Sequence, residues 1–196
     1  MPKILYQGHS SFRLVSDNDT VIYIDPYAGS GYNLKADAIF ITHEHYDHNR
    51  TDLVKLKENA KIYRSCDMLT DGVYRTIKVN DIEITSVPAY NEHHNKAECV
   101  GYLITIDKLK LYFAGDTGET EFMHSLADKM LDYAFLPMDG VYTMTPQQAA
   151  QCAELINPKY AVPIHTKVGG IFDMKAVRAF RTKKQKIIMP NIEVDL

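Results

Sequence analysis

Three histidines and one aspartate occupy four of the six positions from His43 to His48, within the segment THEHYDHN, although the whole chain has only eight histidines. His43 and His45 are two positions apart, so their side chains point to the same side of an extended segment. Asp47 and His48 come next, where the chain begins to turn, so their side chains can face a second point close to the one that His43 and His45 face. Imidazole nitrogens combined with carboxylate oxygens suit zinc, and also iron or manganese. The segment therefore indicates a metal site.

Further candidate ligands lie far along the chain, each just past the end of an apolar stretch that suits a strand. His93 and His94 follow ITSVPAY, Asp116 follows LYFAG, and His165 follows AVPI. Ligands are commonly carried on loops that a rigid sheet holds in position. With one of His93 and His94 counted, there are seven donors. That set is too large for one tetrahedral ion, but it fits two ions about 3.5–4 Å apart that share a carboxylate.

The elements that must position these residues are mostly short strands, rich in β-branched and aromatic residues, with single helices between them. Strands are predicted at ILYQG, SFRLV, TVIYID, AIFI, KIYR, RTIKV, DIEITSVP, CVGYLITI, KLYFAG, DYAFLP, AVPIH and KIIMP. Helices are predicted after Thr51, over Glu121–Met130, after Thr145 with a capping box to Gln148, and over Asp173–Lys184. The pattern predicts an α+β fold with two packed sheets flanked by helices, in a single domain over residues 1–196.

The arrangement His43-x-His45-x-Asp47-His48 resembles the signature of the metallo-β-lactamase superfamily. Asp25 in VIYIDP resembles the first, structural aspartate of that family, and PAYNEHH, FAGDT and VPIH resemble its later motifs. The resemblance covers nearly the whole chain. It is closest to the small, lid-less metal-dependent hydrolases related to ascorbate-phosphate lactonases, to which GHSSF and YTMTPQQAA are also similar. It implies a four-layer αββα sandwich with the site at the sheet edges.

Carried over to this chain, the resemblance implies a complete set of ligands for two divalent ions. His43, His45 and one of His93 and His94 would hold the first ion, and His94 is preferred because it precedes the next strand as the family's ligand does. Asp47, His48 and His165 would hold the second ion, and Asp116 would bridge the two. Zn²⁺ is the expected metal, with Mn²⁺ or Fe²⁺ as alternatives.

The expected chemistry is metal-assisted hydrolysis of an ester, lactone, thioester or phosphodiester. Two ions lower the pKa of a shared water, so that a bridging hydroxide is available as the nucleophile at neutral pH. Asp47 or Asp116 is the candidate catalytic group that orients this nucleophile or passes a proton to the leaving group. Two divalent ions, two carboxylates and a hydroxide leave a charge of about +1, which favours a small anionic substrate.

Other functions remain open for the same residues. A mononuclear iron centre could act on a thiol or persulfide, and a site closed by protein would make a non-catalytic metal-binding protein. The tripeptide from Asp116 to Gly118 also spells the aspartic protease motif. That enzyme class needs a second such aspartate, and the chain has one copy.

Several residues near the motifs have no single expected role. His9 could support a ligand or form the pocket wall, and a structural role is expected for it. Asp25 could cap a turn or orient a ligand histidine. Tyr142, Thr143 and Lys167 could line the pocket.

Composition narrows the partners and the compartment. The net charge is −3 and no basic block stands out, which argues against nucleic acid. Three scattered cysteines form neither a disulfide framework nor a metal knuckle. No apolar run approaches the roughly 18 residues of a membrane span. We expect a cytoplasmic protein without a membrane partner, and the 13 tyrosines leave room for a homo-oligomer.

Overall fold

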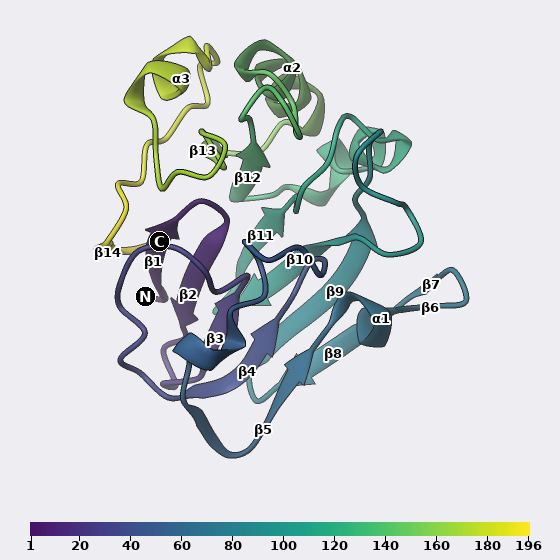
Figure 1. Ribbon diagram of the computed structural model, residues 1–196. Coiled ribbons are helices and arrows are strands. Elements are labelled where there is room, and N and C mark those ends of the chain that lie inside the picture. Colours follow the sequence, from purple (N-terminus) through teal and green to yellow (C-terminus); the bar gives the residue numbers. More distant parts are fainter.

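Two six-stranded sheets pack face to face in the computed structural model, which describes residues 1–196 (Figure 1). The strands of the first sheet follow the order β14 (Ile192–Asp195), β1 (Lys3–Gly8), β2 (Ser11–Val15), β3 (Val21–Ile24), β4 (Ala36–Phe40) and β5 (Leu56–Tyr63). Those of the second sheet follow the order β13 (Tyr160–Ile164), β12 (Tyr133–Pro137), β11 (Leu109–Phe113), β10 (Val100–Ile106), β9 (Ile82–Pro88) and β8 (Thr76–Val79). The predicted α+β sandwich is confirmed.

The remaining elements are short. β6 (Leu69–Thr70) and β7 (Val73–Tyr74) pair with each other. The helices are α1 (Ser65–Met68), α2 (Pro146–Ile156) and α3 (Met174–Ala179), and the 3₁₀ turns are η1 (Thr51–Leu53), η2 (Glu121–Ser125) and η3 (Ala127–Lys129). None of these helices combines the length and the apolar character that a membrane-spanning helix needs.

Alternation along the strands places one face of each sheet in the space between them. Ile22 and Ile24 of β3 belong to this central core, whereas Val21 and Tyr23 belong to a cluster on the outer face. The period of two in side-chain direction produces this division. In the central core, the rings of Phe113 and Phe135 stack with centroids 4.2 Å apart. Such an aromatic pair contributes about 0.5–1.5 kcal/mol beyond the area that it buries.

The two outer layers differ in construction. α2, α3 and η2 cover the second sheet through a separate apolar cluster, and α2 and α3 lie together beside β12 and β13 (Figure 1). The outer face of the first sheet is covered by the segment 26–35 and η1, through Tyr32, Leu34 and Leu53. One of the two outer layers, both predicted to be helical, is therefore an irregular segment with a single 3₁₀ turn.

The predicted helix after Thr51 is wrong. The chain makes only the 3₁₀ turn Thr51–Leu53 and then runs as β5, which pairs in parallel with β4. Leu53, Val54 and Leu56 gave a helical spacing, but of these only Val54 is buried. Pairing β5 satisfies the backbone groups along the edge of β4, which an isolated short helix could not do.

Three other boundaries also differ from the prediction. The segment predicted as one helix over Glu121–Met130 is divided into η2 and η3, and the helix predicted over Asp173–Lys184 is limited to α3. KIIMP is not a strand, because the bridge at this point is isolated and joins Gln185 to Ala161. The last strand is β14, which pairs with β1 and brings the two chain ends together (Figure 1).

Candidate metal centre

The seven residues predicted as ligands gather at one edge of the sandwich because the strands that precede them run in the same direction. β3 and β4 are parallel neighbours, and β11, β12 and β13 are parallel to one another. β9 has the same direction as β11, because both are antiparallel to β10. The carboxyl ends of these strands therefore open onto a common edge, where a β-sheet fold commonly carries its functional loops.

Close packing at this edge joins the two sheets. The backbone N–H of Val100 donates to the carbonyl of Thr42 at 2.9 Å, and the Tyr102 hydroxyl donates to the carbonyl of Ile41 at 2.7 Å. Gly115 adopts a φ of +66°, and a Cβ at this position would lie 2.7 Å from the carbonyl oxygen of Val100. A larger residue cannot take this place, so the glycine lets Asp116 approach the loop that carries His43.

Asp116 lies at the middle of the cluster. Its Oδ2 atom is 3.3 Å from Nε2 of His165 and 3.5 Å from Nε2 of both His48 and His94. All four side chains are buried. Three imidazole nitrogens thus converge on one carboxylate oxygen.

The ligand atoms form three overlapping groups, each within 4.8 Å. One group is His43, His45 and His94; a second is His43, His48 and Asp116; and a third is His9, Asp47, His48 and His165. Asp116 therefore lies between a group of three histidines and a group that contains Asp47. Apart from His9, these groups contain the same residues that the sequence predicted.

Asp25 holds two of the rings in place. Its Oδ2 accepts from Nδ1 of His48 at 2.8 Å and from the hydroxyl of Thr42 at 2.6 Å, and its Oδ1 accepts from the backbone N–H of Thr42 at 2.8 Å. The Thr42 oxygen lies 3.0 Å from Nδ1 of His43 and accepts from it. With Nδ1 engaged, each ring presents Nε2 to the centre. Of the two roles considered for Asp25, the structure shows the orienting one.

Two further residues that lie against ring nitrogens of the cluster, Asn91 and Asp139, were not predicted. Oδ1 of Asn91 lies 3.0 Å from Nδ1 of His94, and Oδ2 of Asp139 lies 3.1 Å from Nδ1 of His165. Asp139 follows the end of β12 as closely as Asp116 follows β11, so the strand-end pattern that identified the other residues could have found it. Asn91 lies within the PAYNEHH segment and has no comparable signal.

The neighbours His93 and His94 have different environments. His94 is buried, whereas the side chain of His93 is 41% exposed and lies 3.5 Å from Glu92. The structure therefore brings His94, the preferred candidate, into the cluster. Tyr142 lines the pocket beside it, but Thr143 and Lys167 do not. Thr143 instead accepts a hydrogen bond from the backbone N–H of Asp139.

Burial and mutual charge shift the pKa values at the centre in opposite directions. Burial alone would raise the pKa of Asp116, but the adjacent rings of His165 and His48 hold it well below its usual range. Burial alone would lower the pKa of His165, but the Asp116 carboxylate raises it to about 9. Burial keeps the pKa of His43 well below that of free histidine. The Asp116 carboxylate therefore attracts positive charge, and the neutral ring of His43 lies in the same cluster. In such an environment a metal cation can replace protons.

Unsatisfied atoms at the centre fit a metal as the missing partner. Nε2 of His43, Nε2 of His48 and Oδ1 of Asp116 are buried and have no hydrogen-bond partner. Buried polar atoms in proteins are nearly always paired, and each exception calls for an explanation. Three such atoms, two of them on rings whose other nitrogen is held by an oxygen, have the donor types and orientation that zinc requires.

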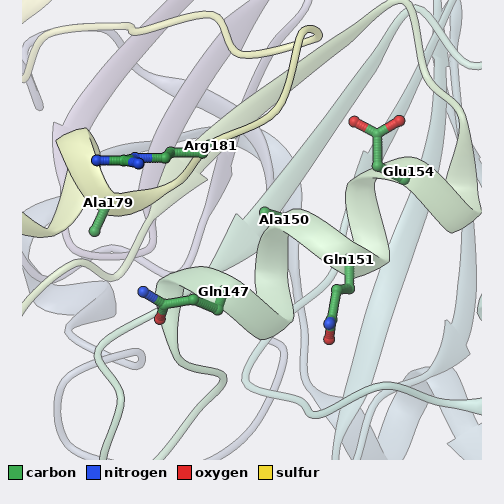
Figure 2. Close-up of a pocket in the computed structure, with 6 residues that line it drawn as sticks. All are labelled: Gln147, Ala150, Gln151, Glu154, Ala179 and Arg181. Atoms are coloured by element: carbon green, nitrogen blue, oxygen red, sulfur yellow. The ribbon is translucent and has the colours of Figure 1, made fainter.

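Pockets adjoin the centre and also occur elsewhere. A cavity of about 480 Å³ opens onto His45, Asp47, His94, Asp116 and His165, and its other lining residues are Glu44, Tyr46, Tyr142, Val168 and Gly169. A hollow of about 570 Å³ lies between α2 and the end of α3, where Figure 2 shows Gln147, Ala150, Gln151, Glu154, Ala179 and Arg181. This second hollow contains none of the clustered residues. A further hollow of about 380 Å³ borders His43, His45 and His94, but the cavity of about 480 Å³ reaches Asp116 and residues of both groups and is the candidate substrate pocket.

Sequence comparisons agree with the motif resemblance. Residues 3–165 match the family described as "Beta-lactamase superfamily domain". A UPF0173 metal-dependent hydrolase from Thermococcus onnurineus is 32% identical, and the match covers 84% of each chain. A UPF0173 metal-dependent hydrolase from Sulfolobus acidocaldarius is 29% identical, and the match again covers 84% of each chain.

Solved structures share the fold. A Parabacteroides distasonis protein whose name refers to metal-dependent hydrolases aligns with a TM-score of 0.76 at 31% identity, covering 96% of this chain and 92% of that one. A metallo hydrolase from Ignicoccus hospitalis aligns with a TM-score of 0.75 over 98% and 97% of the two chains, and its 24% identity bears on the fold alone. The chain therefore belongs to the β-lactamase superfamily and has the metallo-β-lactamase fold.

Proposed function

We propose that this protein is a hydrolase with a binuclear metal centre, which holds two Zn²⁺ ions and cleaves a small ester, lactone or thioester. The observation that carries the proposal is the convergence of three imidazole Nε2 atoms on Oδ2 of Asp116, at 3.3–3.5 Å. Relatives that are named metal-dependent hydrolases support the same activity.

The overlapping groups of ligand atoms support a definite division of the residues. His43, His45 and His94 would hold one ion, and Asp47, His48 and His165 would hold the other. Asp116, which lies within reach of both groups, would bridge them. Nitrogen and carboxylate donors of this kind suit zinc, and Mn²⁺ or Fe²⁺ remain alternatives for the same set.

Bound divalent ions supply a nucleophilic water that is activated at neutral pH and polarise the oxygen that gains charge. The chain's own residues orient the histidine rings and accept or donate protons. Asp25 and Asn91 contact Nδ1 of His48 and His94 by hydrogen bonds, and Asp139 lies 3.1 Å from Nδ1 of His165. Asp47 faces the pocket, and its contact with His9 keeps its pKa below the usual value although burial would raise it. As a carboxylate at neutral pH, Asp47 can accept a proton and pass it to the leaving group.

The lining of the 480 Å³ cavity supports an acyl substrate. No lysine or arginine lines this cavity, while Tyr46, Tyr142 and Val168 offer apolar surface. A phosphodiester would find no cationic side chain there, so its charge would rest on the ions alone. A lactone, ester or thioester with an apolar part fits the lining better. The opening also distinguishes this centre from a closed, non-catalytic metal site.

Metal content tests the binuclear centre directly. Protein purified without added metal, and then reconstituted with Zn²⁺ or Mn²⁺, is expected to hold two ions per chain by elemental analysis. Fewer than two ions per chain after reconstitution would contradict the binuclear proposal. Oxygen consumption with a thiol substrate, without hydrolysis of any lactone, ester, thioester or phosphodiester, would instead favour the mononuclear iron alternative.

Asp116→Ala tests the bridge. This variant is expected to lose at least one ion and to lower hydrolysis by more than about 100-fold, the upper end of the effect of losing only an outer-sphere partner. Asp128→Ala is the matched control, because Asp128 is exposed on η3, away from the cluster. Full metal content and full turnover in Asp116→Ala would show that Asp116 is not the bridging ligand.

A further inference from the structure

His9 lies in the turn between β1 and β2 and is fully buried against the candidate metal centre. Its ring centroid is 3.7 Å from that of His165 and 5.4 Å from that of His48. Nε2 of His9 lies 3.2 Å from Oδ2 of Asp47, and Nδ1 lies 3.2 Å from the carbonyl oxygen of Gly170. The ring therefore touches two candidate ligands of the same ion, Asp47 and His165.

The backbone of His9 joins the same parts of the molecule. Its N–H donates to the carbonyl of Ile171, and its carbonyl accepts from the N–H of His165, both at 2.8 Å. The Tyr6 hydroxyl donates to the same carbonyl at 2.9 Å. The preceding residue must be glycine, because a Cβ on Gly8, whose φ is +111°, would lie 2.2 Å from the side chain of Ile171. The turn thus locks the loop after β13 against the first sheet.

His9 differs from the candidate ligands in how its ring is used. Nε2 of His43 and of His48 makes no hydrogen bond, as expected for a nitrogen that binds a metal. Both ring nitrogens of His9 face oxygen atoms of the protein instead. This is the arrangement of a group that holds a ligand in place, since such groups fix the orientation of the residues that bind the metal.

We propose that His9 is a positioning residue that fixes the Asp47 carboxylate relative to His165, and thereby shapes the ion site formed by Asp47, His48 and His165. This inference rests on the proposed binuclear centre. The hydrogen bonds and ring contacts of His9 do not include His43, His45 or His94, so the first ion site is expected to be independent of it.

Two substitutions separate the contact with Asp47 from the other roles of His9. The amide nitrogen of Gln extends about as far as Nε2 of histidine, so His9→Gln can still donate to Asp47. Asn is shorter and reaches only the position of Nδ1, so His9→Asn loses the Asp47 contact. Asn also tolerates the φ of +55° at this position, and the three backbone hydrogen bonds do not involve the side chain. We therefore expect His9→Asn to fold, and the melting temperature of His9→Gln measures the cost of placing glutamine at the same φ.

The experiment titrates metal-free protein with Co²⁺ and Zn²⁺, following the visible absorption of Co²⁺ and the stoichiometry by elemental analysis. Wild type and His9→Gln are expected to bind two ions with the same affinities and the same Co²⁺ spectrum. His9→Asn is expected to bind one ion normally and the other about 10- to 100-fold more weakly, with a changed spectrum for that ion. His124→Asn is the matched control, because the His124 side chain is 58% exposed on η2.

Several outcomes would overturn the inference. Unchanged affinities in His9→Asn would mean that Asp47 needs no support from His9. Equal losses at both ion sites, accompanied by a lower melting temperature, would indicate a general effect on folding. An equal loss in His9→Gln would indicate that the ring itself binds the ion. If wild type bound fewer than two ions, the binuclear centre would fail together with this inference, whereas the other outcomes leave the centre intact.

Discussion

Asp25 supports the centre through three hydrogen bonds to one carboxylate. Its two oxygens accept from the backbone and hydroxyl of Thr42 and from the ring of His48, although the side chain is almost fully buried. Thr42 extends this support to His43. A single residue outside the ligand set therefore orients one candidate ligand of each ion, which explains why an aspartate at this position matters although it does not face the pocket.

Asp25→Asn is expected to lower the free energy of unfolding of the metal-free protein by about 2–3 kcal/mol. The amide keeps one acceptor oxygen, and its nitrogen can only donate, so at least one of the three donors loses its partner. The backbone is not the cause of this loss, because asparagine tolerates the φ of +44° at this position. Urea unfolding measures the change.

Asp52→Asn provides the comparison for that measurement. Asp52 forms an exposed ion pair with Arg50, and such pairs contribute about 0–1 kcal/mol. A loss in Asp25→Asn no larger than the loss in Asp52→Asn would contradict the role assigned to Asp25.

The orienting residues illustrate what residue-level reasoning can predict. Histidine and aspartate at strand ends indicated all seven residues that the structure brings together. Asp139 lies at the same kind of position, just past β12, and the pattern therefore includes it, whereas its contact with His165 is given by the tertiary structure. His9 follows Gly8 in a tight turn, and the sequence contains no signal that this turn faces a loop more than 150 residues away.

At the scale of elements, strong local signals were reliable and amphipathic spacing was not. The box predicted at the start of α2 is present, with the Thr145 hydroxyl accepting from the N–H of Gln148 and the Gln148 side chain accepting from the N–H of Thr145. The apolar spacing after Thr51 predicted a helix where the chain pairs as β5. Caps depend on a few adjacent residues, whereas pairing of an edge strand depends on a partner elsewhere in the sheet.

Thr145→Ala is expected to destabilise the protein by about 1 kcal/mol, because it removes the cap of α2. For a chain of this size, that loss lowers the melting temperature by about 2–4 °C. Calorimetry measures the shift, and metal content is expected to stay at the wild-type value. Gln147→Ala serves as the control, since Gln147 is exposed on the same turn and takes no part in the box. An equal shift in both variants would contradict the capping role.

At the scale of the whole molecule, the centre joins the two sheets. His43, His45, Asp47 and His48 come from the loop after β4, while Asp116 and His165 follow strands of the second sheet. Ions that bind residues from both sheets bind only the folded state, so they stabilise the sandwich as a whole. In their absence, the carboxylates of Asp25, Asp47, Asp116 and Asp139 share a small, largely buried volume in which each of them lies beside a histidine ring.

Removal of metal by a chelator is expected to lower the melting temperature by roughly 5–10 °C, the effect of losing a ligand present at about 100 times its dissociation constant. Adding Zn²⁺ back should restore the original value. The Asp116→Ala variant, which lacks the bridging carboxylate, should show a smaller response to both treatments. If neither chelator nor zinc changed the melting temperature of the wild type, the proposal that a metal links the two sheets would be contradicted.

The sequence by itself determined the donor types, their strand-end positions and the sandwich class, because these depend on residue chemistry and on a period of two along the strands. It also favoured His94 over His93. The tertiary structure decided which atoms meet: that Asp116 lies between two groups, that Asp25 binds the ring of His48, that Asp139 lies beside His165, and that His9 contacts Asp47. These contacts join segments distant in sequence, and their geometry follows from how two sheets pack and which strands run parallel. Local sequence patterns indicate neither how the sheets pack nor which strands run parallel.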